Sequence, residues 1–391
     1  MKSDWKTVTL AEISTQLSDG LHKAPLFIPG GEYIFVNATN LENGAIVDKD
    51  PEKHTTYEEY LKYGVPLNDR TILYSIDGTI GNIARYRGEK CVLGKGACYI
   101  SISNDVDVDY VYYQLQSPHF KSYIESMSTG STIRHISLKT MRNYAFSLPN
   151  LSIQKKIGRA LAVIDEKVAI NRKINDNLQQ QAIAIFRQEL LRDGELPEGW
   201  VSGNLLDIAN YLNGLAMQKF RPADGENGLS VLKIKELRQG TCDASSELCS
   251  PRIKPEYIVH DGDVIFSWSG SLLVDLWCGG TCGLNQHLFK VTSEKYPKWF
   301  YYAWTAHHLA RFVAIAADKA TTMGHIKREE LEKAKVIIPD AASMERIGGI
   351  LQPMYDLIIS NRIENRKLAA LRDTILPQLM SGEIDVSNID I

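Results

Sequence analysis

Two polar, glycine-containing segments of this sequence carry side chains suited to binding phosphate groups and base edges. They cover residues 128–135 and 319–327. Hydroxyl groups donate hydrogen bonds to phosphate oxygens, and Arg134 or Lys327 can neutralise a phosphate charge. The same side-chain types read the edges of nucleic-acid bases. The candidate residues in these segments are Ser131, Thr132, Arg134, His135, Thr321, Thr322, His325 and Lys327.

Two further pairs of clusters offer the same kind of chemistry. Glycine allows a backbone to approach a ligand closely, and polar or basic neighbours supply donors. The second pair of clusters is Gly78, Thr79 and Lys95 in the first half, with Ser269, Gly270, Ser271, Gln286 and His287 in the second half. The third pair of clusters is His22 and Lys23 in the first half, with Gln218 and Lys219 in the second half. Each cluster follows a glycine and could enter a groove of a nucleic acid.

Each cluster also has an interpretation without a ligand. The segments at 128–135 and 319–327 suit loops that cap the next helix. Gly78 and Gly270 suit tight turns, and the third pair suits solvated loops. The occurrence of each cluster in both halves does not decide between the two interpretations, because a capping loop would be duplicated as well.

Metal and catalytic signals are weak in this chain. The cysteines that invite a zinc interpretation are Cys242, Cys249, Cys278 and Cys282. They lack the close Cys-x2-Cys spacing of zinc sites, so buried reduced thiols are favoured and no metal is predicted. Glu58-Glu59 and Glu329-Glu330 suit solvated helix faces. Adenine-methylation motifs, a Gly-x-Gly-x-x-Gly cofactor loop and a Walker loop are absent, so we predict no catalytic residue.

The sequence contains an internal repeat, so the elements that must position these clusters occur twice. Asn171-Arg172 followed by Asn175 returns as Asn361-Arg362 followed by Asn365, a shift of 190 residues (361 − 171). The same shift relates the two Pro and the two His-Ile positions, which are Pro149 and Pro339, His135-Ile136 and His325-Ile326. Two copies cannot form a solenoid of many repeats. They predict two similar lobes related by a pseudo-two-fold axis, which suits a two-fold symmetric partner such as double-stranded DNA.

Composition limits the class of protein. The chain has 391 residues, 44% of them hydrophobic and 23% charged, which is ordinary for a globular protein of two domains. No apolar run is long enough to span a membrane, and the first residues lack a signal core, so we expect a cytoplasmic protein. The net charge is −3. A DNA-binding protein with this charge must gather its basic residues on one face and share phosphate contacts with another subunit.

Each copy divides into a mixed part and a helical part, so the predicted fold class is α+β. Short strand-like runs at 72–75, 98–101, 263–267 and 287–291 lie between turn signals, and helices are predicted over 111–126 and 298–317. The predicted domains are a target-binding domain at 1–150, a helical spacer at 151–195, a second target-binding domain at 196–340 and a second spacer at 341–391.

The spacers have the heptad pattern of a coiled coil. Residues 152–192 contain no proline, could reach about 60 Å as a helix, and end before the stop signal Asp193-Gly194. Their apolar positions alternate at intervals of three and four. The predicted seam consists of Ile157, Leu161, Ile164, Val168, Asn171, Asn175, Leu178 and Ile185 in the first helix, with Leu351, Met354, Ile358, Asn361, Asn365, Leu368 and Ile375 in the second. Pro353 should kink the second helix or mark the first turn of its long straight part.

The asparagines favour an antiparallel pairing of the two spacers. A buried amide costs about 1–3 kcal/mol unless it finds a partner. If Asn171 faces Asn365 and Asn175 faces Asn361, the flanking layers are apolar on both sides, except that Ile164 faces Arg372. The alternative is that each helix packs only on its own domain.

Taken together, these features resemble the specificity (S) subunit of type I restriction-modification enzymes. The resemblance covers essentially the whole chain. It rests on Asp77–Asn82 in the first half, on 267–271 with 284–290 in the second, and on the two Asn-Arg-x-x-Asn helices. Any one of these motifs is weak evidence, whereas their order and duplication are specific.

The resemblance implies a function without catalysis by this chain. Each lobe is expected to be a target-recognition domain that reads one half of a split sequence in double-stranded DNA, with the coiled coil as a ruler. Two methyltransferase (modification) subunits and motor-nuclease (restriction) subunits are the expected partners. S-adenosylmethionine and ATP would bind those partners, so no cofactor is expected here. The recognised bases do not follow from the sequence. The alternative function is a coiled-coil scaffold whose two lobes bind proteins and have no DNA role; an enzyme ranks third.

Overall fold

The computed structural model describes residues 5–127, 135–191, 194–318 and 326–389. The chain divides into two compact units. Unit 1 joins Met1–Glu166 to Ala369–Ile391, and unit 2 is Lys167–Leu368. Each unit therefore holds a lobe of strands and short helices together with part of both long helices. We call the part of unit 1 before residue 151 lobe 1, and residues 196–340 of unit 2 lobe 2.

Lobe 1 contains eleven strands among its described residues. These are β1 (Lys6–Thr9), β2 (Ser14–Asp19), β3 (Tyr33–Val36), β4 (Leu41–Glu42), β5 (Ala45–Ile46), β6 (His54–Thr55), β7 (Thr71–Ser75), β8 (Ile83–Arg85), β9 (Cys91–Leu93), β10 (Ala97–Ile102) and β11 (Ala145–Leu148). Its α-helices are α1 (Tyr57–Tyr63), α2 (Val108–Gln114), α3 (Pro118–Met127) and α4 (Leu138–Asn143).

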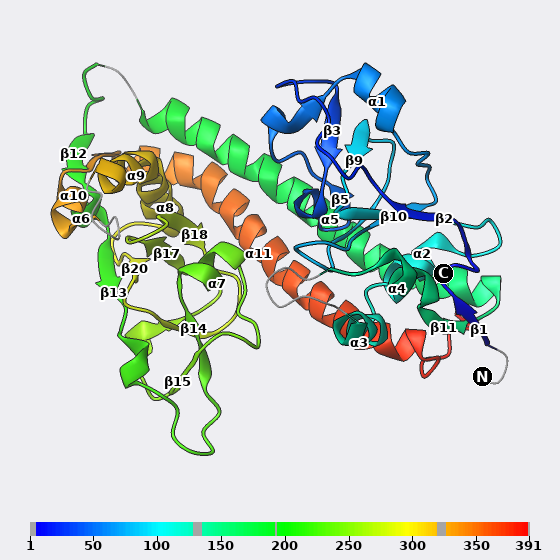
Figure 1. Cartoon of the computed structure of the whole chain (residues 1–391). Helices are drawn as coiled ribbons and strands as arrows, with labels where there is room; N and C mark the ends of the chain where they lie inside the picture. The colour runs from blue at the N-terminus through cyan, green and yellow to red at the C-terminus, as the bar shows by residue number, and fades with distance from the viewer. Residues whose placement is uncertain (1–4, 128–134, 192–193, 319–325, 390–391) are drawn as a thin grey trace. The chain divides into compact units, whose positions relative to one another are not determined.

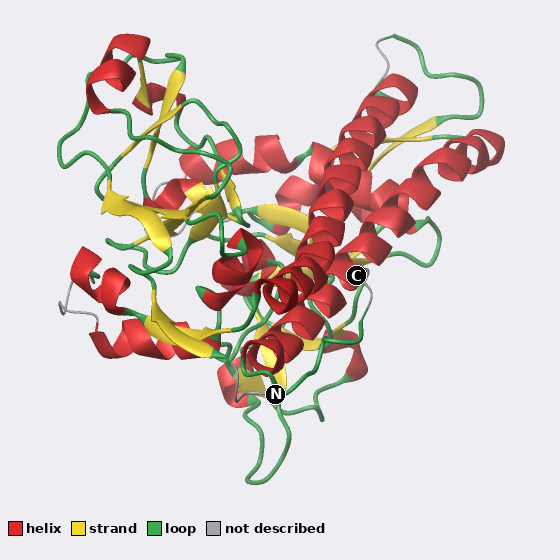
Figure 2. Cartoon of the chain, turned by 90° about the vertical axis from the view of Figure 1, so that its right-hand side faces the viewer, coloured by secondary structure: helices red, strands yellow, loops and turns green. Residues whose placement is uncertain are grey.

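Lobe 2 is built in the same way. Its described strands are β12 (Val201–Asn204), β13 (Asn210–Asn213), β14 (Leu229–Leu232), β15 (Leu248–Cys249), β16 (Ile258–Val259), β17 (Val264–Ser267), β18 (Leu273–Leu276), β19 (Cys282–Leu284), β20 (Leu288–Thr292) and β21 (Lys335–Ile338). Its helices are α6 (Leu205–Ile208), α7 (Ile234–Gln239), α8 (Lys298–His307), α9 (Leu309–Asp318) and α10 (Arg328–Glu332). Helices and strands are thus mixed along the chain, as the α+β class requires (Figure 2).

The sequence repeat is a repeat of sheet topology. The main antiparallel sheet has the order β2-β10-β7-β8 in lobe 1 and β13-β20-β17-β18 in lobe 2. A smaller sheet contains one parallel pair in each lobe, β3 with β9 and β14 with β19. The first and last strands of each lobe also pair, β1 with β11 and β12 with β21. Two copies of one fold therefore place corresponding residues at corresponding points.

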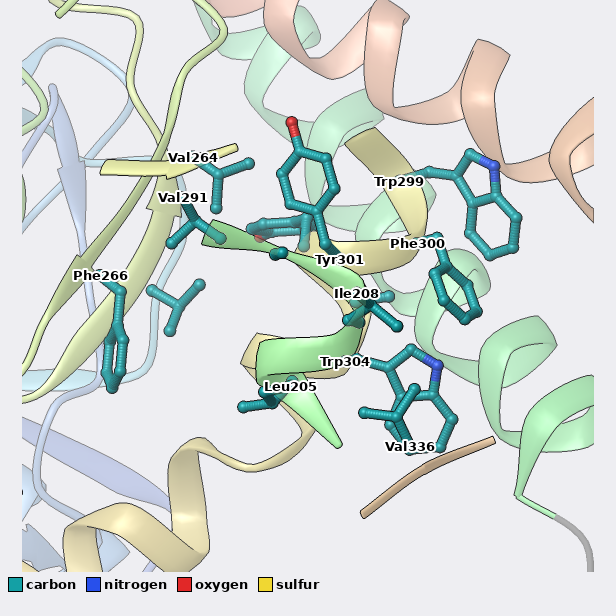
Figure 3. Close-up of a cluster of buried hydrophobic side chains, with 14 of the residues drawn as sticks. Leu205, Ile208, Val264, Phe266, Val291, Trp299, Phe300, Tyr301, Trp304 and Val336 are labelled. Carbon is teal, nitrogen blue, oxygen red and sulfur yellow. The ribbon is translucent and has the colours of Figure 1, made fainter. Parts of the chain in front are cut away.

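Apolar side chains from sheet and helix form a separate core in each unit. In unit 2, Val264, Phe266 and Val291 from the sheet gather with Trp299, Phe300 and Trp304 from α8 (Figure 3). Residues 299–305 are all buried, so α8 is enclosed by protein around its whole circumference. Burying such aromatic rings is the largest source of stability that a core of this kind has.

The helices predicted over 111–126 and 298–317 are each divided in two. In lobe 1 the break lies between α2 and α3, where Pro118 disfavours helical backbone at the preceding residue. Ser117 there accepts a hydrogen bond from the Phe120 amide at 3.2 Å and so caps α3. In lobe 2 the break lies at His308, between α8 and α9. The prediction of one continuous helix was wrong in both lobes.

The two longest helices, α5 (Leu151–Leu190) and α11 (Ala341–Met380), follow the lobes (Figure 1). Both begin after matching caps. Asn150 accepts a hydrogen bond from the Ile153 amide at 3.0 Å, and Asp340 accepts one from the Ser343 amide at 2.8 Å. Helix α11 runs without interruption on both sides of Pro353.

The asparagine layers lie within unit 2. Asn171 Nδ2 donates to Asn365 Oδ1, and Asn361 Nδ2 donates to Asn175 Oδ1, both at 2.9 Å. These are the two pairs that the antiparallel register predicts. None of the predicted seam residues is exposed. Further along, Leu178 and Met354 pack on the core of unit 2. In unit 1 the seam residue Ile157 shares a core with Leu376.

Arg372, which the register places opposite Ile164, keeps its charge paired in unit 1. Its guanidinium bonds Asp165 at 2.8 Å and Asp373 at 2.9 Å. Asp165 also accepts a hydrogen bond from the Tyr113 hydroxyl at 2.9 Å, which ties the helix pair to lobe 1. The mixed layer is therefore satisfied by an ion pair rather than by apolar contact.

Candidate nucleic-acid interface

Three separate segments of lobe 1 meet at one edge of its main sheet. Strands β2 and β7 end there and β10 begins, because Cys98 pairs with Asp19 and Ala97 with Ser75. The Lys95 amide donates to the Leu21 carbonyl at 2.9 Å, which joins the segment of His22 to the segment before β10. The Ile136 amide donates to the Ile76 carbonyl at 2.8 Å, which brings His135 beside the turn after β7.

The side chains at this edge of lobe 1 include two carboxylates, a lysine and two histidines. Asp77 lies 3.3 Å from Lys95 Nζ and 3.8 Å from His135 Nδ1. His22 Nε2 lies 2.9 Å from a carboxylate oxygen of Asp19. Three of the predicted residues, His22, Lys95 and His135, are therefore brought together with two carboxylates. We call Asp19, His22, Asp77, Lys95 and His135 the lobe 1 cluster.

Sequence reasoning missed both carboxylates of the lobe 1 cluster. Asp19 and Asp77 each precede a glycine, and Asp-Gly is a common turn signal. At Asp77 that reading of the backbone is right, since Gly78 has a positive φ of 70°. Asp19 instead ends strand β2, and Gly20 has no positive φ. The turn reading did not show that the aspartate side chains share an edge with the predicted basic residues.

The corresponding edge of lobe 2 is assembled by the same backbone contacts. The Gln286 amide donates to the Leu215 carbonyl at 2.9 Å, as Lys95 does to Leu21. The Ile326 amide donates to the Trp268 carbonyl at 3.1 Å, as Ile136 does to Ile76. Ser269 and Gln286 in lobe 2 thus occupy the places of Asp77 and Lys95 in lobe 1.

The lobe 2 edge carries hydroxyl, amide, imidazole and indole groups in place of the carboxylates and the lysine of lobe 1. The Ser269 hydroxyl and His287 Nδ1 are hydrogen-bonded at 2.9 Å, and Trp268 Nε1 donates to Asn213 Oδ1 at 3.0 Å. Ser269 is buried, so its hydroxyl serves to hold His287. Sequence reasoning missed Trp268 and Asn213. We call Asn213, Trp268, Ser269, Gln286 and His287 the lobe 2 cluster.

Two glycines let the segments come together. A Cβ atom on Gly20 would lie 2.2 Å from the Leu93 carbonyl oxygen, and one on Gly214 would lie 2.2 Å from the Asn285 carbonyl oxygen. No side chain fits at either distance. The glycines that precede the third pair of predicted clusters are therefore required by packing within the lobe.

The other predicted residues lie around these clusters or outside the described residues. Thr79, Gly270 and Ser271 lie on exposed turns beside the clusters. Lys23 is also exposed, with its ammonium 5.0 Å from the centre of the Tyr63 ring. The remaining exposed candidates are Gln218 and Lys219 in a 3₁₀ helix and Lys327 before α10. Ser131, Thr132, Arg134, Thr321, Thr322 and His325 lie outside the described residues.

A separate cleft of about 520 Å³ in lobe 1 is lined by two ion-pairing residues, Arg85 and Asp109, with Asp69, Tyr86, Arg87 and Gly88. Within the described ranges, no group of three or more His, Cys, Asp or Glu side chains is arranged to hold a metal. Cys249, Cys278 and Cys282 are buried thiols and Cys242 is half-buried. No helix in the described part of the chain is long and apolar enough to cross a membrane.

Comparison with known proteins assigns these lobes to a family. The family model for the type I restriction modification DNA specificity domain matches residues 2–180 and again 197–371. The chain is 24% identical over 342 residues to the type I restriction enzyme MjaIX specificity subunit of Methanocaldococcus jannaschii, covering 82% of this chain and 78% of the relative. It is 22% identical over 395 residues to the MjaVIII specificity subunit of the same organism, covering 88% and 89% of the two chains.

A solved structure has the same fold. The crystal structure of the type I restriction-modification system S subunit from M. genitalium matches with a TM-score of 0.56 at 16% identity, covering 96% of each chain. Both matched regions of the family model contain one complete lobe, and the two lobes share one topology. The chain therefore belongs to the family of type I restriction-modification specificity subunits and carries two copies of its DNA specificity domain.

Proposed function

We propose that this chain is the DNA-recognition subunit of a type I restriction-modification complex and reads a bipartite double-stranded site, one half with each lobe. The observation that carries this proposal is the pair of clusters at equivalent sheet edges. One backbone framework presents carboxylates with a lysine and histidines in lobe 1, and hydroxyl, amide and aromatic groups in lobe 2. Such a pair suits two half-sites of different sequence.

The proposed domains follow the predicted boundaries. Target recognition belongs to residues 1–150 and 196–340, while 151–195 and 341–391 set the gap between the half-sites. The remaining candidate residues, including those at 131–134 and 321–327, are proposed to contact the phosphates or bases that flank each cluster. The chain supplies no catalytic residue and binds no cofactor. S-adenosylmethionine and ATP belong to the partner subunits, and the complex acts in the cytoplasm.

Docking of two methyltransferase subunits and of motor-nuclease subunits is the second part of the proposal. In unit 2 the long helices expose large apolar side chains, among them Ile170 at 54%, Ile174 at 40% and Leu357 at 45%. Ile170 and Ile174 are one helical turn apart and share a face. Exposed apolar stripes of this kind suit a protein partner.

A direct test is to express the chain with its methyltransferase partner and map the methylated adenines across a genome. The expected result is methylation at one bipartite sequence with a fixed gap. Binding to one continuous sequence would contradict the two-lobe model. Omitting the chain while keeping the methyltransferase is the control, and it should abolish the pattern.

The small excess of acidic over basic residues favours one competing function. In this function the chain is a scaffold whose lobes bind proteins. The net charge of −3 is unusual for a protein that binds DNA alone. Salt titration distinguishes the two functions, because DNA affinity that depends on phosphate contacts falls steeply as salt rises. A complex whose DNA affinity does not change with salt would favour the scaffold.

A further inference from the structure

Asp77 occupies the centre of the lobe 1 cluster. It follows β7, which ends at Ser75, and it forms an isolated antiparallel bridge with His135. Its carboxylate lies 3.3 Å from Lys95 Nζ, which comes from the segment before β10. The three residues therefore come from three different segments, and the carboxylate is where their side chains converge.

The carboxylate retains capacity to accept further hydrogen bonds. Its side chain is 26% exposed. His135 Nδ1 is buried and has no hydrogen-bond partner among the described residues, since its 3.8 Å separation from Asp77 exceeds hydrogen-bonding distance. An ionised carboxylate offers about four acceptor positions, and within the described part of the chain Lys95 occupies one. The described residues thus hold Asp77 in place without filling its acceptor positions.

The repeat shows that the fold does not need an aspartate here. The corresponding residue in lobe 2 is Ser269, fixed by the equivalent backbone bonds of Ile136 and Ile326. Ser269 is 4% exposed and bonds His287. The same turn therefore accepts a buried neutral residue in one lobe and a partly exposed charged residue in the other, so the difference is one of surface chemistry.

A carboxylate on a surface that meets DNA is unfavourable unless it has a specific task. Phosphates repel it, and this repulsion weakens binding to every sequence. Lys95 beside Asp77 offsets that charge. In base recognition, Asp and Glu accept hydrogen bonds from exocyclic amino groups, and they cannot bond the acceptor oxygens of guanine or thymine.

We propose that Asp77 is a specificity-determining residue that accepts a hydrogen bond from an exocyclic base amino group, cytosine N4 or adenine N6, in the half-site of lobe 1. Lys95 and His135 act as positioning residues. The inference rests on the proposed function, since it requires that lobe 1 reads DNA. It goes further by naming the base chemistry and one residue that reads it.

The test uses the complex with its methyltransferase and a library of bipartite sites with each base randomised in turn. Asp77→Asn keeps the size and shape of the side chain but adds a donor. We expect discrimination at one base pair of the lobe 1 half-site to fall about 10-fold or more. Every position of the other half-site should keep its preference. Asp77→Ser, which copies lobe 2, should give the same local loss if the Asn variant fails to fold.

Two matched variants exclude a general effect of charge. Glu52→Gln removes one exposed carboxylate of lobe 1 away from the cluster and should leave all preferences unchanged. Lys95→Met should weaken binding on all sequences and make the salt dependence shallower by about one unit, while the base preference is kept in direction. Thermal melting and assembly with the methyltransferase should match the wild type for each variant.

The outcomes separate the inference from the proposed function. If the wild-type complex prefers no bipartite site, the proposed function fails. If it has such a preference and Asp77→Asn changes affinity equally on all sequences, only the inference fails, and Asp77 serves solely to hold Lys95. Local loss at one base pair of the lobe 1 half-site supports both. Local loss confined to the half-site of lobe 2 overturns the assignment of Asp77 to lobe 1 recognition.

Discussion

Asn175 and Asn361 form a buried amide pair in unit 2, each 7% exposed, with one amide donating to the other. Changing Asn361 to Val leaves the Asn175 oxygen without its donor, so we expect the free energy of unfolding to fall by about 1–3 kcal/mol. Changing both residues to Val removes both polar groups, and most of the loss should be recovered. Urea denaturation of the two single variants and the double variant measures this coupling.

Lys173→Ala is the control for the asparagine pair, because Lys173 is exposed on the same helix. It should change stability by only a few tenths of a kcal/mol. A double Val variant no more stable than the weaker single variant would show that the amide pair is not what these residues contribute.

His308 should make unit 2 sensitive to acid. Burial lowers its pKa from 6.5 to about 4, and its Nε2 donates to the Lys335 carbonyl at 2.8 Å, so the folded protein holds it neutral. Below pH 6.5 the imidazole of His308 binds a proton in the unfolded chain, whereas in the folded protein it stays neutral down to about pH 4. Stability contributed by the neutral form is therefore complete above pH 6.5 and falls as the pH drops towards about 4. The total loss is at most about 3 kcal/mol.

Urea denaturation at a series of pH values checks this behaviour. His308→Leu should be less stable than the wild type at pH 8, because the Lys335 carbonyl loses its donor. The variant should also lack the component of the pH dependence between 4 and 6.5. Identical slopes for the two proteins in that interval would mean that His308 does not titrate as described.

Two arginines of helix α11 form ion pairs with aspartates of lobe 2. Arg366 bonds both carboxylate oxygens of Asp261 at 2.8 and 2.7 Å and the Cys278 carbonyl, and Arg362 bonds Asp275 at 2.7 Å. The pair at Asp261 is partly exposed, so we expect Arg366→Met to cost about 1–2 kcal/mol. Hydrogen exchange at β18 and the loop that follows should speed up.

Acid should remove the same contact. The hydrogen bonds from Arg366 lower the pKa of Asp261 below its ordinary 3.8, so the stabilisation is present above that value and is lost as the pH falls through the lowered pKa. The neighbouring residue Lys367 is exposed, and Lys367→Met should leave exchange at β18 unchanged. Equal effects of the two variants would rule out a specific clamp.

At the level of elements, periodic patterns were predictable and long-range contacts were not. The heptad spacing predicted both long helices and the asparagine layers, because one helix face is read from local intervals. It did not predict Phe186 and Tyr355, which are buried where the helices meet lobe 2. The break at Pro118 has a local signal, whereas the break at His308 has none.

The candidate sites were predictable only in part, for the same reason. The three polar segments of each half could be found, but their meeting at one sheet edge depends on backbone bonds between residues far apart, such as Lys95 to Leu21 and Ile136 to Ile76. Asp77 was read as half of a turn signal. Its role beside Lys95 becomes visible only once the sheet has formed.

In the whole molecule, neither lobe completes its core alone. Ile157 and Leu161 of α5 share the core of unit 1 with Leu376 and Leu379 of α11. The core of unit 2 likewise contains Ala182 and Phe186 of α5 with Ile347 and Leu351 of α11. Each unit thus needs residues from both long helices. The repeat is built into one molecule because each copy contributes helix to the other copy's core.

The net charge of −3 predicts how the whole molecule meets DNA. Few phosphates can be neutralised by this chain alone, so its DNA affinity without a partner should be weak, with Kd of about 1 µM or higher at physiological salt. The methyltransferase complex should bind more tightly and with a steeper salt dependence, because the partner adds phosphate contacts. Fluorescence anisotropy over a range of salt concentrations, with and without the methyltransferase, measures both slopes. Equal slopes would mean that this chain makes all the phosphate contacts. Despite its net charge of −3, the chain would then need a basic face that is sufficient by itself.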